Sequence, residues 1–151
     1  MVGSAQGPKS RIYHLTSLNT GQRYVTCGEK HVNLWDCSSK TPKATTVKFH
    51  KIKEVSKNSK FLCTTNAASN GYIVCTDKGH VVLCHDNVAS SFGYHNDEGE
   101  GRPVNAVCSS DGGDVICTGG YDGSVVMWFV EGTNLFKIGT IKVTPEVSGV
   151  V

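Results

Sequence analysis

The sequence predicts an all-β protein built from repeated four-stranded units. Its apolar runs are short, rich in Val, Ile, Tyr and Thr, and interrupted by Gly or Asn, a pattern typical of strands and not of amphipathic helices. The 17 glycines are scattered singly and in pairs beside only four prolines, as many tight turns require. With 151 residues, 38% of them hydrophobic and 19% charged, the chain is long enough to fold as one domain.

Three segments of the chain resemble one another. Each has a Cys-bearing strand, then a turn, then a second strand that carries Trp or Cys, and they span residues 24–36, 72–85 and 115–129. The first landmarks, Cys27, Cys75 and Cys117, are 48 and 42 residues apart. The second landmarks, Trp35, Cys84 and Trp128, are 49 and 44 residues apart. A period of about 40 to 45 residues is that of a β-propeller blade with four antiparallel strands.

Turn residues place the strands of each unit in order. Hairpin turns at residues 19–21, 70–71 and 111–113 separate the first and second strands, and those at 29–30, 77–79 and 122–123 separate the second and third. The fourth strands are expected near residues 44–49, 88–94 and 135–143. The predicted organisation is therefore a flexible tail (1–10), a first blade (11–49), a second blade that includes an acidic Gly-rich loop (50–101), a third blade (102–143) and a C-terminal tail (144–151).

The third unit carries the clearest family signature. Its residues 104–107, 110–113, 118–125 and 127–128 resemble the WD40 repeat nearly in full. The first unit keeps the Trp-Asp dipeptide as Trp35 and Asp36, whereas the second has Cys84 and His85 in its place. A weaker resemblance, over residues 23–35, links the first unit to echinoderm-microtubule-associated-protein-like and related ciliary propellers.

The WD40 resemblance implies a structural hydrogen-bond tetrad made of Trp, Ser or Thr, Asp and His. The third unit offers Thr118, Asp122 and Trp128, but its candidate His95 lies farther upstream than the family pattern expects. The second unit lacks the Trp, and the first has Glu29 in place of the Asp. We therefore expect no unit to complete the tetrad.

Three blades predict an incomplete ring. Propellers usually close with four to eight blades, and each blade buries its faces only against its neighbours. Two apolar faces are therefore expected to lie open, with the missing blades supplied by a longer chain, by a partner or by another copy.

Composition and cysteine usage limit the compartment and the partners. A net charge of +2 does not demand a polyanion, and no apolar run approaches the roughly 20 residues of a membrane helix. Seven cysteines without a Cys-x-x-Cys pair fit a reducing compartment. We expect a cytoplasmic protein without a membrane partner, with cytoskeletal, ciliary or nuclear locations as alternatives.

The residue types that carry catalysis or bind metals do not converge in the sequence. His80 and Cys84 come nearest to ligand spacing, yet residues four apart on a strand are separated by about 13 Å. No phosphate-binding loop or nucleophile motif is present. We predict no catalytic residue, no metal and no cofactor, and an enzyme or metal-binding protein remains only as an alternative.

A basic segment spans residues 40–60. It has seven lysines against one acidic residue, Glu54. The candidate partner-binding residues are Lys48, Lys51, Lys53, Lys57 and Lys60. The main functional prediction is a non-enzymatic interaction scaffold for a protein partner. A microtubule-associated or RNA-binding propeller that uses this segment is the alternative, and a merely solvated connection between blades is the simplest interpretation.

Overall fold

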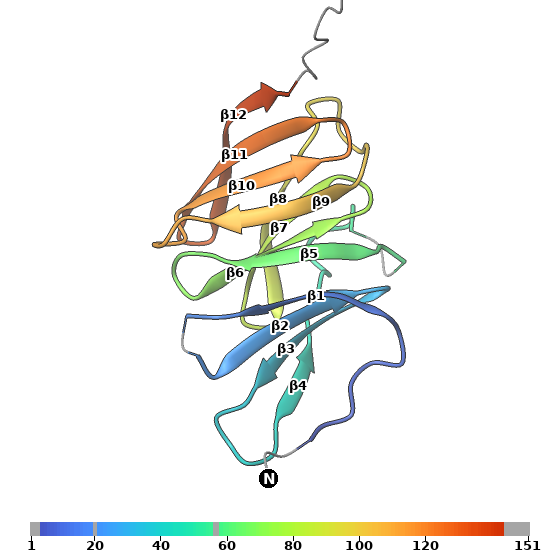
Figure 1. Ribbon diagram of the computed structural model, residues 1–151, viewed down its shortest axis with the longest axis vertical. Coiled ribbons are helices and arrows are strands. Elements are labelled where there is room, and N and C mark those ends of the chain that lie inside the picture. Colours follow the sequence, from blue (N-terminus) through green and yellow to red (C-terminus); the bar gives the residue numbers. More distant parts are fainter. Residues whose placement is uncertain (1–3, 20, 56–57, 144–151) are drawn as a thin grey trace, which may run out of the picture.

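Three four-stranded antiparallel sheets lie stacked along the molecule (Figure 1). The computed structural model describes residues 4–19, 21–55 and 58–143. These residues contain no helix that is long and apolar enough to cross a membrane. The all-β prediction is confirmed, and the three sheets form an unclosed ring of propeller blades.

The strands of each sheet follow one another in sequence and pair with their neighbours. Sheet 1 contains β1 (Ile12–Ser17), β2 (Arg23–Gly28), β3 (His31–Asp36) and β4 (Lys43–Thr46). Sheet 2 contains β5 (Phe61–Asn66), β6 (Gly71–Thr76), β7 (His80–His85) and β8 (Val88–Tyr94). Sheet 3 contains β9 (Val104–Ser109), β10 (Val115–Gly120), β11 (Ser124–Glu131) and β12 (Asn134–Lys142).

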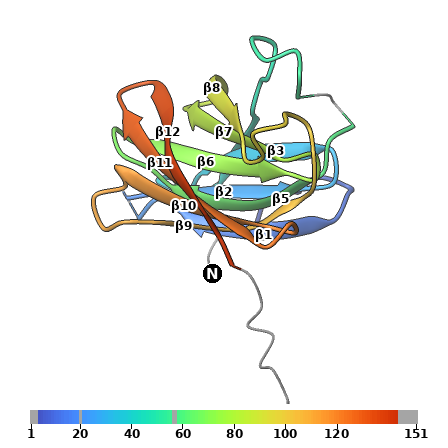
Figure 2. The ribbon, with the colours of Figure 1, turned by 90° about the horizontal axis from the view of Figure 1, so that it is seen from above.

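The first strands of the three sheets lie side by side. β5 contacts both β1 and β9, and the view from above places β1 and β9 on the same side of the molecule (Figure 2). The outer strand β8 lies on the opposite side, and the outer strand β12, which runs across this view, contacts it. This arrangement, with inner strands gathered and outer strands fanned out, is that of adjacent propeller blades.

Sheet 2 supplies the core because it is covered on both faces. Successive residues of β6 point alternately to the two neighbouring sheets, as the pleat of a strand requires. Tyr72 and Val74 join the cluster shared with sheet 1, and Ile73 and Cys75 join the cluster shared with sheet 3. All four are fully buried.

The register of the sheets corrects one landmark of the repeat. Cys27 comes three residues after Tyr24, the strand partner of Trp35, and Cys75 comes three residues after Tyr72, the strand partner of Cys84. Cys117 comes only one residue after Ile116, the strand partner of Trp128. Cys117 is accordingly half-buried and not part of a buried core cluster. The three cysteines are similar in sequence but do not share one place in the blade, because Cys117 comes nearer to the start of its strand than the other two do.

Candidate functional site

The connection between sheets 1 and 2 is packed into the core. Beyond β4, the backbone of Lys48 pairs with the start of β8: its amide donates to Asn87 O (2.7 Å), and its carbonyl accepts from Ala89 N (3.0 Å). Two tight turns follow, closed by Ile52 N to Phe49 O (2.9 Å) and Val55 N to Ile52 O (3.3 Å). The chain is thereby held against the outer edges of both sheets.

Apolar and basic side chains alternate along this connection. Val47, Ile52 and Val55 are buried in the cluster between sheets 1 and 2. The half-buried ring of Phe49 stacks on the buried ring of Phe61 with 5.0 Å between their centroids. The lysines between these anchors are exposed. The fold therefore separates an apolar inner side from a cationic outer side.

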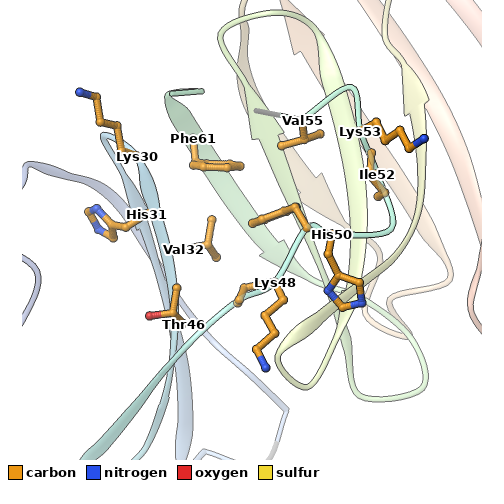
Figure 3. Close-up of a pocket in the computed structure, with 12 residues that line it drawn as sticks. Lys30, His31, Val32, Thr46, Lys48, His50, Ile52, Lys53, Val55 and Phe61 are labelled. Carbon is orange, nitrogen blue, oxygen red and sulfur yellow. The ribbon is translucent and has the colours of Figure 1, made fainter. Parts of the chain in front are cut away.

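A groove of about 650 Å³ opens between the connection and the two sheets (Figure 3). Its floor is apolar, and residues of β3, β5 and the connection supply it: Val32, Val47, Phe49, Ile52, Val55 and Phe61. Three lysines line it, namely Lys30, Lys48 and Lys53, together with Thr46 and two histidines. Clefts of this size, apolar with a few polar groups at the rim, are typical of binding sites.

The charge of the groove has one sign. Within the described part of the chain, no aspartate or glutamate lines it. The ammonium groups of Lys30, Lys48 and Lys53 form no ion pair with a carboxylate of the described residues. These cations are thus available to an external anion, beside an apolar surface that lowers the local dielectric constant.

The structure brings together only part of the predicted basic set. Lys48 and Lys53 line the groove, whereas Lys51 is exposed on the turn between them and is not a lining residue. Lys60 is exposed beside β5, where its backbone exchanges hydrogen bonds with Asp77. Lys57 lies outside the described residues.

Sequence reasoning missed Lys30 and the apolar floor of the groove. Lys30 belongs to the β2–β3 hairpin, far from the lysine cluster in sequence, and has a φ of 64° in its tight turn. A signal for the floor was present: Val47, Phe49, Ile52 and Val55 recur at intervals of two or three residues within the basic segment. A purely solvated connection has no need of such apolar spacing.

The third sheet completes the hydrogen-bond tetrad, so the expectation that no unit does so is wrong. Trp128 Nε1 donates to Thr118 Oγ1 (2.8 Å), and His95 Nδ1 lies 2.9 Å from the same oxygen. On the other side of the ring, His95 Nε2 lies 2.8 Å from Ser124 Oγ, which donates to Asp122 Oδ1 (2.6 Å). His95 is available because it directly follows β8, so the outer strand of one sheet delivers it to the next sheet.

The network fixes the tautomer of His95. Since the Ser124 hydroxyl donates its hydrogen to Asp122, its oxygen must accept from Nε2–H of the ring. Nδ1 is then an acceptor for the Thr118 hydroxyl. Burial lowers the pKa of His95 below its ordinary value, although the nearby Asp122 carboxylate opposes this shift.

The other two sheets keep only fragments of this network. In sheet 1, Trp35 Nε1 donates to Thr26 Oγ1 (2.8 Å), and Asp36 is exposed, accepting from the amide of Ser38. In sheet 2, the buried Cys84 occupies the Trp position. These residues are structural parts of the blades and do not form a reactive cluster.

Some cysteines of the described chain are neighbours across a sheet, as Cys63 and Cys75 are, but they form no metal-binding group. No three His, Cys, Asp or Glu side chains of residues 4–19, 21–55 and 58–143 come together in a way that could hold a metal ion. Burial raises the pKa of the Cys27 thiol to about 12, so this thiol is a weak nucleophile. His80 is fully buried, and burial lowers its pKa, with Glu100 3.6 Å from its ring.

Comparisons with known proteins agree with this architecture. The sequence model described as "WD domain, G-beta repeat" matches residues 90–128, which run from within β8 through β9 and β10 into β11. Among solved structures, the β-propeller domain of Cps50 (Swd1) from Myceliophteria thermophila is similar, with a TM-score of 0.71 and 8% sequence identity. The match covers 89% of this chain and 46% of that chain, so this chain spans about half the length of the propeller it resembles. No curated protein matches the sequence significantly.

Residues 90–128 are therefore similar to a WD40 repeat, and the chain as described has the fold of a β-propeller domain. WD40 propellers generally mediate protein interactions and are generally not catalytic. The matched segment explains the position of His95, because one sequence repeat combines the outer strand of sheet 2 with three strands of sheet 3. His95 precedes the strands of sheet 3 in the sequence, but it lies inside the matched repeat.

Proposed function

We propose that this chain is a non-enzymatic interaction scaffold that binds an acidic polypeptide segment in the groove between sheets 1 and 2. The observation that carries the proposal is the composition of the groove: among the described residues, three lysines line an apolar floor and no carboxylate does. A peptide that carries glutamates or aspartates around one apolar side chain matches both features. The sheets act as a rigid frame that contributes residues such as Lys30, Val32 and Phe61, and the connection at residues 47–55 supplies most of the other contacts.

The two kinds of contact have different roles. The apolar floor favours one buried aliphatic or aromatic side chain, at about 25 cal/mol for each Å² removed from water. The exposed lysines attract and orient the acidic flanks, and each contributes modestly because solvent screens it. Neither contact alone gives specificity, whereas their juxtaposition selects acidic segments that also carry an apolar residue.

A polypeptide fits the groove better than RNA does. Binding of single-stranded nucleic acid depends on aromatic faces on which bases stack. The two phenylalanine rings of the groove, Phe49 and Phe61, already stack on each other, and Phe61 is only 3% exposed. An acidic protein tail, such as those on the surface of microtubules, is of the class we propose, and a cytoplasmic or cytoskeletal location would suit it.

The binding of a synthetic peptide tests this proposal. A fluorescent peptide with glutamates on both sides of one leucine is titrated with the chain at low and high salt. We expect binding that weakens steeply with salt, because the charges are exposed and screened. Lys48→Glu with Lys53→Glu should weaken binding about tenfold, and replacing the leucine of the peptide by serine should also weaken it.

The matched control makes the same change in net charge at two lysines outside the groove. Lys40→Glu with Lys43→Glu alters two exposed lysines that do not line the groove, and this variant should bind almost as the original chain does. Equal losses in both double variants would mean that the peptide responds only to net charge. Tighter binding of a single-stranded RNA than of the peptide would also contradict the proposal.

A further inference from the structure

The outer face of sheet 3 is apolar, yet nothing covers it among the described residues. Phe129, Phe136 and Ile141 are 38%, 49% and 58% exposed. The corresponding face of sheet 2, formed by residues such as Val81 and Leu83, is completely buried against sheet 3. The corresponding face is therefore buried in the core in sheet 2 and exposed to solvent in sheet 3.

Register defines two positions that meet when one blade packs on another. The Trp position on the third strand holds Trp35, Cys84 and Trp128 in sheets 1, 2 and 3. The second position is on the fourth strand of each sheet, or on the chain that continues this strand. It is the residue paired with the third-strand residue that comes three before the Trp position. Here Val47 N donates to Val32 O, Gly93 pairs with Val81, and Ile141 pairs with Val125. We call this second place the receiving position.

The two interfaces inside the chain combine a large residue with a small one. Between sheets 2 and 3, the indole of Trp128 fills the space over Gly93, where an added Cβ would lie only 2.5 Å from Cζ3 of the indole. Between sheets 1 and 2, the receiving position holds Val47 and the Trp position holds the smaller Cys84, both buried in one cluster. Close packing makes such volume matching necessary, because an extra methylene in a filled core costs about 1–3 kcal/mol.

We propose that the outer face of sheet 3 binds one further four-stranded blade that carries a small residue at its Trp position, and that Ile141 sets this requirement. The interface would continue the stacking of sheets 1, 2 and 3. Its pattern would be that of Val47 with Cys84, because Ile141 is a branched side chain where sheet 2 has Gly93. A blade with Trp at that position meets a filled site and is rejected.

The same rule determines how two copies of this chain interact. The side of sheet 1 that faces away from sheet 2 carries the half-buried Trp35, and the N-terminal segment lies beside it: a Cβ added at Gly7 would lie 4.0 Å from its Cη2 atom. Head-to-tail docking of a second copy would set this tryptophan against Ile141, which combines two large residues. Two unmodified copies therefore do not complete a ring by placing sheet 1 of one on sheet 3 of the other.

Sedimentation velocity of four proteins tests the rule: the original chain, Ile141→Gly, Trp35→Ala and the variant with both changes. Each single change creates one large–small pair, because Ile141→Gly leaves Trp35 facing a glycine and Trp35→Ala leaves Ile141 facing an alanine. We expect both single variants to associate head to tail at least about tenfold more tightly than the original chain. The double variant pairs two small residues and leaves a void, so it should associate less than either single variant.

Control variants distinguish volume matching from nonspecific association. Ile138→Gly removes the same side chain from a residue on β12 that is 57% exposed but not at the receiving position, so it should behave as the original chain. Circular dichroism confirms that each variant is folded. Equal association of the original chain and the single variants would overturn the proposal. So would tighter association of the double variant, a gain from Ile138→Gly, or no association in any variant.

Discussion

The ring of His95, at the end of the outer strand of sheet 2, lies 2.9 Å from the hydroxyl of Thr118 in sheet 3. This contact belongs to a continuous series of donors and acceptors that runs from the indole of Trp128 to the carboxylate of Asp122. All of its buried polar groups are satisfied, which buried networks need if they are to stabilise a fold. The network therefore joins the second blade to the third, and its hydrogen bonds fix the orientation of one blade relative to the other.

The two tryptophans are expected to contribute unequally to stability. Trp128→Phe removes the donor to Thr118 from a side chain that is 1% exposed, and should lower the free energy of unfolding by about 1–2 kcal/mol. Trp35→Phe removes a similar hydrogen bond, to Thr26, at a half-buried site where no described histidine joins the network. Its loss should be smaller, as urea denaturation can measure. An equal loss would mean that burial and the His95 network add nothing.

Stability should fall as the solution becomes acidic. In the folded protein, burial lowers the pKa of His80, His85 and His95 below the ordinary histidine value of about 6.5. Below that pH the unfolded chain binds more protons, so protonation favours unfolding until the folded-state pKa values are passed. Thermal unfolding between about pH 7.5 and pH 5 should show a falling midpoint. His95→Gln should reduce this slope, and an unchanged slope would show that His95 is not part of the effect.

An extra methyl group at Gly93 should be costly. Gly93→Ala places a Cβ 2.5 Å from the indole of Trp128, so the interface between sheets 2 and 3 must shift, at about 1–3 kcal/mol. Gly139→Ala on β12 is the matched control, because its added Cβ meets nothing within 4 Å. Denaturation of both variants measures the difference. If the two substitutions were equally tolerated, the tight packing of Trp128 on β8 would be wrong.

The floor of the groove should tolerate change at Phe49 better than at Phe61. Phe61 is 3% exposed within the core between sheets 1 and 2, so Phe61→Ala should cost about 3–5 kcal/mol. Phe49 is half-buried on the connection, and Phe49→Ala should cost less while still weakening binding of the acidic peptide. Unfolding and peptide titration separate the two effects. Full binding by a folded Phe49→Ala variant would remove this ring from the site.

Cysteine labelling should follow exposure. Cys37 and Cys108 are exposed and should react first with a thiol reagent, as mass spectrometry of digested samples can show. Cys27 should react only after unfolding, because it is fully buried and its thiol has a pKa raised to about 12. Rapid labelling of Cys27 in the native protein would contradict the packing of sheet 1 on sheet 2.

The repeat was readable from the sequence because turns and strand patterns are local. The hairpin signals around Asn70 and Asp122 and the spacing of Trp35 and Trp128 sufficed to predict three four-stranded blades. The completion of the tetrad could not be predicted in the same way, because His95 is separated in sequence from the sheet whose hydrogen-bond network it completes. The groove was missed for a similar reason: Lys30 reaches it from a hairpin distant in sequence, and only the folded chain brings it beside Lys48.

Chemical-shift mapping of the chain with the acidic peptide tests the central claim most directly. In isotope-labelled protein, binding should shift the amide signals of Val32, Val47 and Ile52, which line the groove. The signals of sheet 3 residues such as Val115 and Met127 should stay in place, because they lie outside the groove. If the shifts instead spread over the whole basic surface, or if they centre on the open face of sheet 3, the groove between sheets 1 and 2 is not the binding site.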